Sequence, residues 1–364
     1  MIEQILIDNY KSIRSLRLPL RRLNVLIGSN GAGKSNLISF FELTKAIYEQ
    51  RFGGYTLEHG GIDNLLYRGR KVSPVMKGLL DFDNNNAVFY AIKPAQSNKG
   101  YIDCVGDYFN SRHLPEKDYD KWNRIFWDKG VEESTLIRNM KWRAAYLKNF
   151  LESFTVYHFH DTSATSPMRG MSSINDNERL RDNGSNLAAC LYRLMRTDEK
   201  AFRLVEGVVR SIAPYFKGFK LRPDPLNNAN IALEWEEQDS DMYLDGYSLS
   251  DGTLRFIALA TLLLQPRLPE IIIIDEPELG LHPAAINKLA EMIKKASAES
   301  QIIISTQSAS LVDCFGVEDI IVVDRVDGQS VFRHLPEEEL DMWMRDYDFS
   351  LSELWEKNMI GGQL

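Results

Sequence analysis

Gly28-Ser29-Asn30-Gly31-Ala32-Gly33-Lys34-Ser35 is the stretch that decides the fold of this 364-residue chain. It matches the pattern G-x-x-x-x-G-K-[ST] at every fixed position. Residues 22–27 before it predict a strand, and residues 34–48 after it repeat apolar side chains at helical spacing. Strand, glycine-rich loop and helix in this order form the context in which the pattern binds a nucleoside triphosphate. A glycine turn before an unrelated helix is the weaker interpretation.

The chemistry of this loop predicts how it would hold ATP. Consecutive backbone N–H groups at the positive end of a helix attract phosphate oxygens, and glycines let the backbone approach them closely. Lys34 is expected to contact the β- and γ-phosphates, and the Ser35 hydroxyl is expected to ligate Mg²⁺. The predicted ATP-binding residues in this region are Asn30, Gly31, Ala32, Gly33, Lys34, Ser35 and Asn36.

A second stretch, Ile271-Ile272-Ile273-Ile274-Asp275-Glu276-Pro277, predicts where the catalytic carboxylates lie. Four consecutive isoleucines are typical of a strand that is buried on both faces. Ligands bind at the carboxyl ends of parallel strands, so Asp275 is expected to bind Mg²⁺ through water. Glu276 is placed to polarise the attacking water as a general base. The alternative is an acidic turn after a buried strand.

Residues 247–255 form a polar, glycine-bearing turn before a strongly apolar helical segment. Ser250 or Asp251 is a natural N-cap for that helix. The same hydroxyl and N–H groups, at Ser250 and Gly252, could instead bind a γ-phosphate. The residues alone leave both interpretations open.

The composition sets limits on the class of protein. The chain is 44% hydrophobic, carries a formal net charge of −8 and contains three scattered cysteines. Its apolar runs are too short for a membrane span, and its N-terminus lacks the features of a secretory signal. We therefore expect a cytoplasmic protein with reduced thiols and no membrane partner. The basic clusters at residues 14–22 and 68–71 are more typical of solvated faces than of DNA contacts.

The order of expected elements predicts three parts and an α/β fold. Residues 1–100 are expected to contain strands and the phosphate loop. Residues 101–215 are expected to be a mainly helical insertion, from which strand 155–160 returns to the core. In residues 216–364, helices and strands alternate after residue 252, which predicts a largely parallel sheet covered by helices.

Residues 249–253, placed shortly before residues 275–283, resemble the ABC-type ATPase heads of the RecF/SMC/OLD-like branch, often described as AAA family ATPases. Residues 9–13 followed by 23–28 also match the opening of that branch. The resemblance covers roughly residues 1–95, 155–160 and 245–325. It implies a P-loop NTPase head with a mainly parallel sheet, N-terminal antiparallel strands and an inserted helical lobe.

In that family two heads enclose two ATP molecules, so the resemblance implies a homodimer or a higher oligomer. It implies that residues 249–253, the signature loop, contact the ATP of the other head through Ser250, Gly252 and Thr253. It also implies that residues 279–281 are the D-loop, which crosses the dimer interface. Lys11 and Ser12 would flank the nucleotide.

The chain departs from the family pattern at two positions. Gln307 stands where a switch histidine is usual, and a glutamine can donate to a γ-phosphate but cannot carry a proton. We therefore expect slow hydrolysis that depends on Glu276. No clear Q-loop glutamine is present. His158 and His160 share one face of the expected strand 155–160, and for either of them a structural role is as compatible with the sequence as a Mg²⁺ or lid role. His160 and Asp161, which lie nearest the end of that strand, are the candidates for the Q-loop position.

Two functions follow from these expectations. The first is an ATPase that regulates a separate nuclease or toxin, in prokaryotic defence against phage. OLD-like relatives often carry a TOPRIM nuclease domain after the head, and none is expected before Leu364. The alternative is a RecF-like DNA-repair ATPase that binds duplex DNA through residues 68–71 and through Lys117, Lys121, Arg124, Lys141 and Arg143. A transporter subunit is disfavoured.

Overall fold

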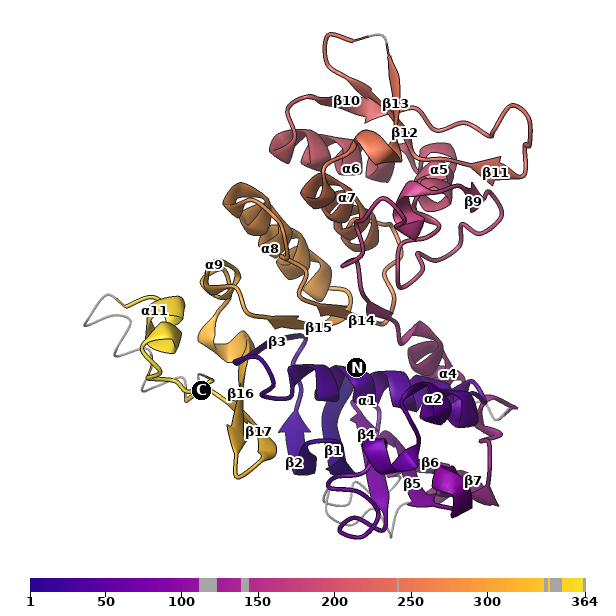
Figure 1. The fold of residues 1–364 in the computed structure, drawn as a ribbon, viewed down its shortest axis with the longest axis vertical. Coiled ribbons are helices and arrows are strands. Elements are labelled where there is room, and N and C mark those ends of the chain that lie inside the picture. Colours follow the sequence, from indigo (N-terminus) through magenta and orange to yellow (C-terminus); the bar gives the residue numbers. More distant parts are fainter. Residues whose placement is uncertain (111–122, 139–143, 241, 337–339, 341–348, 363–364) are drawn as a thin grey trace. The chain divides into compact units, whose positions relative to one another are not determined.

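Figure 1 shows a computed structural model, which describes residues 1–110, 123–138, 144–240, 242–336, 340 and 349–362. The chain divides into two compact units. The first unit comprises residues 1–154, 270–272 and 316–364, and the second comprises residues 155–269 and 273–315. Within the described ranges, no helix combines the length and the apolar character that a membrane span requires.

The first unit contains a sheet of antiparallel neighbours in the order β2-β1-β4-β5-β6-β7. Ile5 and Ile7 of β1 are fully buried, as alternation along a half-buried strand requires. Asn85 turns the chain between β4 and β5 with φ of 62°. The strands are β1 (Ile2–Tyr10), β2 (Ile13–Pro19), β4 (Met76–Phe82), β5 (Asn86–Pro94), β6 (Gly100–Phe109) and β7 (Asn123–Val131).

The expectation that residues 101–153 are mainly helical is wrong for much of the described part. Residues up to 109 and from 123 to 131 lie in β6 and β7, and the α-helix of this region is α4 (Ala144–Ser153). Tyr108 and Trp127 face each other across the two strands, with ring centroids 5.9 Å apart. Such cross-strand aromatic pairs stabilise a sheet, and they depend on strand pairing that is not visible in the sequence of either strand alone.

The first unit also contains the strand that leads into the phosphate loop. β3 (Leu23–Ile27) pairs in parallel with β16 (Ile320–Val326), which forms an antiparallel hairpin with β17 (Gln329–His334). The helices of this unit, besides α4, are α1 (Lys34–Tyr48), α2 (Phe52–Glu58), α3 (Ile62–Leu65) and α11 (Leu351–Glu356). Leu354 and Trp355 of α11 are buried, so the C-terminal segment packs on this unit.

The second unit carries the acidic strand β14 (Ile271–Asp275), whose last three residues belong to it. β14 pairs in parallel with β8 (Val156–Tyr157), which is shorter than the expected strand 155–160 because His158 N–H donates to Asp182 O instead. The other strands are β9 (Ser172–Ser173), β10 (Phe216–Phe219), β11 (Asn230–Ile231), β12 (Glu234–Glu237), β13 (Tyr243–Asp245) and β15 (Gln301–Thr306). The helices are α5 (Leu187–Thr197), α6 (Glu199–Ile212), α7 (Asp251–Leu263), α8 (Pro283–Ser297) and α9 (Ala309–Val312).

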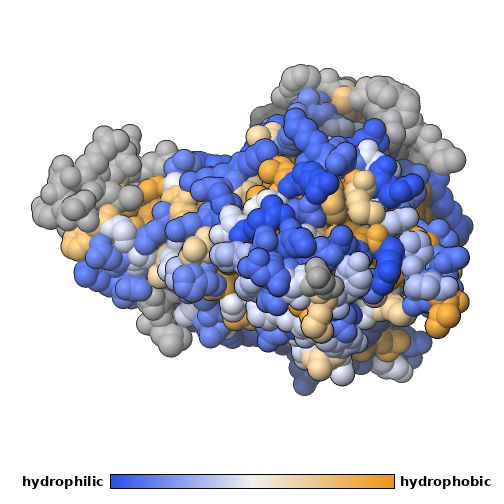
Figure 2. All heavy atoms as spheres, turned by 90° about the horizontal axis from the view of Figure 1, so that it is seen from above, coloured by the Kyte–Doolittle hydropathy of each residue, from blue (hydrophilic) through white to orange (hydrophobic). Residues whose placement is uncertain are grey.

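The surface in view in Figure 2 is mainly hydrophilic, and its hydrophobic side chains lie in small groups. Large exposed side chains of the second unit include Met242, Tyr243 and Tyr247 around β13. Small groups of exposed apolar residues are normal for a protein surface.

Candidate active site

The phosphate loop lies in the first unit, between β3 and α1. Gly33 precedes α1 with φ of 119°, and a Cβ at this position would lie 2.0 Å from Ser330 Oγ. Glycine is therefore required there both for its backbone conformation and for space. The Ser330 hydroxyl donates to Ala32 O at 2.5 Å, so β17 contributes to the shape of the loop.

Further hydrogen bonds hold the loop from outside the motif. Asn36 Nδ2 donates to Ser12 Oγ at 2.6 Å, and Ser12 Oγ lies 2.6 Å from Ser330 Oγ. Arg325 Nη1 donates to Gly31 O at 3.0 Å. Ser12 and Asn36 therefore lie beside the loop, as their predicted role requires. Ser330 and Arg325 were missed, because they lie almost three hundred residues from the motif in sequence.

The two lysines of the predicted site differ in their surroundings. Lys34 is 6% exposed, and its Nζ donates to Gly28 O at 2.5 Å and to Ser29 O at 3.1 Å. Its ammonium group thus lies within the loop that is predicted to hold phosphate. Lys11 Nζ donates instead to Ser39 Oγ on α1 at 2.8 Å, and burial lowers the pKa of Lys11.

Asp275, Glu276 and Gln307 come together in the second unit, at the carboxyl ends of β14 and β15. Ser305 Oγ donates to Asp275 Oδ1, and Gln307 Nε2 donates to Glu276 Oε1. Glu276 adopts φ of 43°, a conformation that costs a residue other than glycine about 1–3 kcal/mol. Such strain is concentrated at functional sites, and it directs the two adjacent carboxylates differently.

Glu278 is a residue of this cluster that the sequence analysis missed. Its side chain is 8% exposed; Oε1 accepts from Thr306 Oγ1 at 2.6 Å and from Gln307 N at 3.3 Å. Oε2 is buried without a hydrogen-bond partner among the described residues. Burial raises the pKa of Glu278. The signal for it in the sequence was a third acidic residue, two positions after Glu276.

The signature loop begins α7, and of the two residues predicted as possible N-caps it is Ser250 that caps the helix. Ser250 Oγ accepts from Thr253 N at 3.2 Å and lies 2.8 Å from Thr253 Oγ1. A Cβ on Gly252 would lie 2.7 Å from Gly280 O, so the signature loop packs against the D-loop of the same unit. Ser250 is exposed. Whether these groups also bind a γ-phosphate stays a prediction.

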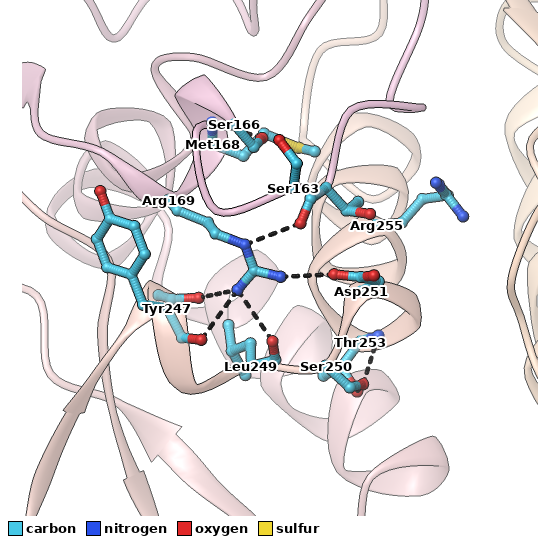
Figure 3. A network of polar contacts seen from close by, with 12 residues as sticks. Ser163, Ser166, Met168, Arg169, Tyr247, Leu249, Ser250, Asp251, Thr253 and Arg255 are labelled. Carbon is cyan, nitrogen blue, oxygen red and sulfur yellow. Dashed lines mark hydrogen bonds and ion pairs between the residues drawn. The ribbon is translucent and has the colours of Figure 1, made fainter.

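Arg169 fixes the backbone before the signature loop (Figure 3). Its side chain is buried, and its guanidinium donates to the carbonyl oxygens of Thr162, Gly246, Tyr247 and Leu249 at 2.6–3.3 Å. Nη2 also pairs with Asp251 Oδ1 at 2.7 Å. No motif in the sequence pointed to Arg169, because its partners are mainly backbone carbonyls about eighty residues away.

The two candidates for the Q-loop position, His160 and Asp161, point to different neighbours. Asp161 Oδ1 accepts from Ser163 N and Ser163 Oγ, at 3.1 and 2.7 Å. His160 instead lies near Asp275, and burial is the main cause that lowers its pKa. The structure therefore brings His160 to the acidic strand, while Asp161 stabilises its own turn.

The residues predicted to hold Mg²⁺ are of the type that this ion prefers. Mg²⁺ binds oxygen ligands, usually one or two protein groups together with phosphates and water. The Ser35 hydroxyl is exposed in the first turn of α1 in the first unit, and the Asp275 carboxylate is half-buried in the second unit. Each side chain offers the expected kind of oxygen donor.

The basic residues considered for DNA contact are partly engaged within the first unit. Arg70 Nε pairs with Asp63 Oδ1 at 2.7 Å, and Arg68 Nη2 donates to Asp327 O at 3.0 Å. The Arg124 guanidinium lies over the ring of Trp127. Lys117, Lys121, Lys141 and Arg143 lie outside the described residues.

Residues 23–313 match the family model described as "AAA domain, putative AbiEii toxin, Type IV TA system". The chain belongs to this family. Among curated proteins, it is 24% identical over 384 residues to the Old nuclease of Escherichia phage P2. The aligned region covers 92% of this chain and 61% of that protein. The chain therefore spans about three fifths of the length of this relative.

Solved structures confirm the fold class. An SMC head bound to the C-terminal winged-helix domain of ScpA matches with a TM-score of 0.62 and 16% identity, over 93% of this chain and 99% of that one. An SMC head with an extended coiled coil, bound to the C-terminal domain of ScpA from Pyrococcus furiosus, matches with a TM-score of 0.59, 15% identity and coverage of 96% and 99%. The chain therefore has the fold of SMC heads, which is the fold class that its resemblance to the SMC/OLD-like branch predicts.

Proposed function

We propose that this ATPase hydrolyses Mg²⁺-ATP slowly, and that its ATP-bound dimer regulates a separate effector protein in the cytoplasm of a prokaryote. The arrangement at the end of β14 is the observation that carries the proposal. There Asp275 accepts a hydrogen bond from Ser305, and Glu276 accepts one from Gln307. A metal-binding carboxylate and an adjacent, separately oriented base are what the hydrolysis of a phosphoanhydride requires.

In this mechanism the phosphate loop binds the triphosphate, with the Lys34 ammonium on the β- and γ-phosphates. Asp275 and Ser35 would hold Mg²⁺, which neutralises charge on the phosphate oxygens. Glu276 accepts a proton from the water whose oxygen attacks the γ-phosphorus, while the bond to the bridging oxygen of ADP breaks. Gln307 orients Glu276 and, through its amide, the γ-phosphate. Because the amide cannot transfer a proton, turnover is slow.

Regulation of an effector is the finer part of the proposal, and the relatives support it. The family description names a toxin, and the phage P2 relative is named a nuclease. We infer that the effector is a nuclease or toxin on another chain, that the setting is defence against phage, and that two copies of this chain join around ATP. The exposed position of Ser250 at the start of α7 is compatible with contact to a second head.

The test is to purify Glu276→Gln with ATP and Mg²⁺ and to measure its mass and the molecules that accompany it. We expect an ATP-bound dimer, because the variant binds the nucleotide but lacks the base, and hydrolysis at least about 100-fold slower than wild type. A second protein in fixed ratio, lost when Lys34→Ala is added, would support effector control.

Three outcomes would contradict parts of the proposal. Turnover at the wild-type rate would exclude Glu276 as the base. A monomer with bound ATP would exclude ATP-driven dimerisation. Nucleic acid that accompanies the dimer and dissociates steeply as salt rises would favour the RecF-like DNA-repair function instead.

A further inference from the structure

Two histidines and the acidic strand form a cluster of metal-ligand type in the second unit. One ligand atom from each of His158, His160 and Asp275 lies within 4.8 Å of the other two. The two imidazole rings are tilted by 37°, with centroids 5.9 Å apart. All three side chains are half-buried. A cation placed among them would therefore be partly shielded from bulk water.

The backbone that carries the histidines is held in place independently of any ligand. The Arg255 side chain is buried, and it donates from Nε to Phe159 O at 2.8 Å and from Nη2 to His160 O at 3.0 Å. His158 N donates to Asp182 O at 2.9 Å. The guanidinium thus bonds two consecutive carbonyl oxygens, and it helps to fix the backbone on which the two histidines lie.

The carboxylate of the cluster is oriented from the other side. Asp275 Oδ1 accepts a hydrogen bond from Ser305 Oγ. Hydrogen bonds of this kind to a ligating carboxylate are typical outer partners in protein metal sites, and they fix the direction of its lone pairs. Glu276 adds a second negative charge beside the cluster, which favours a divalent cation.

We propose that His158, His160 and Asp275 bind a divalent transition-metal ion of the Mn²⁺-to-Zn²⁺ series. Mg²⁺ demands oxygen ligands and near-ideal octahedral geometry, so two imidazoles disfavour it. Imidazole binds first-row transition ions well, and two histidines with one carboxylate form a common donor set for them. Three protein ligands leave at least one position on the ion for water or a phosphate oxygen.

This inference deepens the proposed function and rests on it in one respect: Asp275 belongs both to the proposed ATPase site and to the proposed transition-metal site. It concerns the nucleotide-free chain, in which Asp275 and the two histidines would bind a transition-metal ion; with ATP bound, Asp275 and Ser35 would hold Mg²⁺, as proposed above. The role of Ser35 in binding nucleotide-associated Mg²⁺ is unaffected.

The experiment titrates the nucleotide-free full chain with Co²⁺ in the presence of millimolar Mg²⁺, and records the visible d–d absorption and the stoichiometry. We expect one Co²⁺ per chain, with bands that report nitrogen ligation. His158→Gln and His160→Gln should each weaken binding by at least about 10- to 100-fold, since loss of even an outer partner has that effect. Asp275→Asn should weaken it comparably.

The matched control is His59→Gln, which removes an imidazole from the first unit, and it should bind Co²⁺ like wild type. Circular dichroism and thermal unfolding establish that each variant is folded. Wild-type protein that binds no Co²⁺, or His158→Gln and His160→Gln proteins that bind it as wild type does, would overturn the proposal. Lys34→Ala separates the metal-site hypothesis from the proposed ATPase function. This variant should lose ATP binding and keep the Co²⁺ spectrum, so the metal site can be tested even if the proposed function is wrong.

Discussion

Glu278 is a buried carboxylate with one bonded and one unpartnered oxygen, next to the proposed base. A buried ionised group without full hydrogen bonding destabilises the fold, and this is the physical cause of its raised pKa. Thr306 and the Gln307 backbone offset part of that cost. The same contacts join Glu278 to the segment that carries Gln307, so this buried carboxylate supports the position of the Gln307 amide.

Glu278→Gln should change how stability depends on pH. In wild type the raised pKa means that the folded chain binds this proton more tightly than the unfolded chain. The resulting stabilisation is complete below the ordinary pKa of 4.5 and is lost as pH rises through the folded value. The glutamine variant cannot lose a proton at this position, so its stability has no such dependence on pH. As pH rises above 4.5, the free energy of unfolding in urea should therefore increase for the glutamine variant relative to wild type.

Glu299→Gln, which replaces an exposed carboxylate of the same unit, is the matched control for this comparison. If the difference between Glu278→Gln and wild type is the same at every pH, Glu278 does not titrate in the folded chain as its burial indicates. A shift seen equally in both variants would point to a general charge effect rather than to the buried site.

At the scale of elements, the parts with a local signal were predicted from the sequence and the parts held by distant contacts were not. The phosphate loop, the isoleucine strand β14 and the Ser250 cap of α7 depend on neighbours in the chain, so their patterns are visible in one sequence. β6 and β7 depend on pairing with each other and with β5, which the density of lysines and aromatic residues concealed. Three side chains donate hydrogen bonds to backbone carbonyl oxygens far away in the sequence: Arg169, Ser330 and Arg325. Every residue has a backbone carbonyl, so such contacts leave no recognisable sequence pattern at the accepting residues.

The segment from β13 to α7 depends on Arg169, and Arg169→Lys should loosen it. Lysine keeps the charge but cannot reach four carbonyl oxygens and Asp251 at once, because it has a single nitrogen where arginine has a planar fork. Several buried carbonyls would lose their donors, so we expect the free energy of unfolding to fall by at least about 2 kcal/mol. Hydrogen exchange should rise at residues 246–251.

The control for this prediction is Arg181→Lys, which changes an ion pair with the partly exposed Asp176 in the same unit and should alter stability little. Unchanged hydrogen exchange at residues 246–251 in a folded Arg169→Lys protein would show that the α7 cap, rather than Arg169, determines the position of the signature loop.

At the scale of the whole molecule, the proposal requires that one chain completes the ATP site of another. The fold is that of SMC heads, and Ser250 is exposed where α7 begins, but its hydroxyl is also the cap of its own helix. A capping role acts within one chain, whereas a phosphate-binding role would act between two. The two roles predict different consequences for a large residue at this position.

Ser250→Arg separates them. In the Glu276→Gln background, the long arginine side chain should prevent two heads from closing, so sedimentation with ATP and Mg²⁺ should show a monomer. A fluorescent ATP analogue should still bind within about threefold of the parent affinity. Loss of the cap alone would cost about 1 kcal/mol of stability and leave the dimer intact.

Ser211→Arg adds the same charge to an exposed position on α6 and should dimerise normally. A Ser250→Arg protein that still dimerises would confine Ser250 to its capping role, and one that loses ATP binding as well would place Ser250 in the nucleotide site of its own chain.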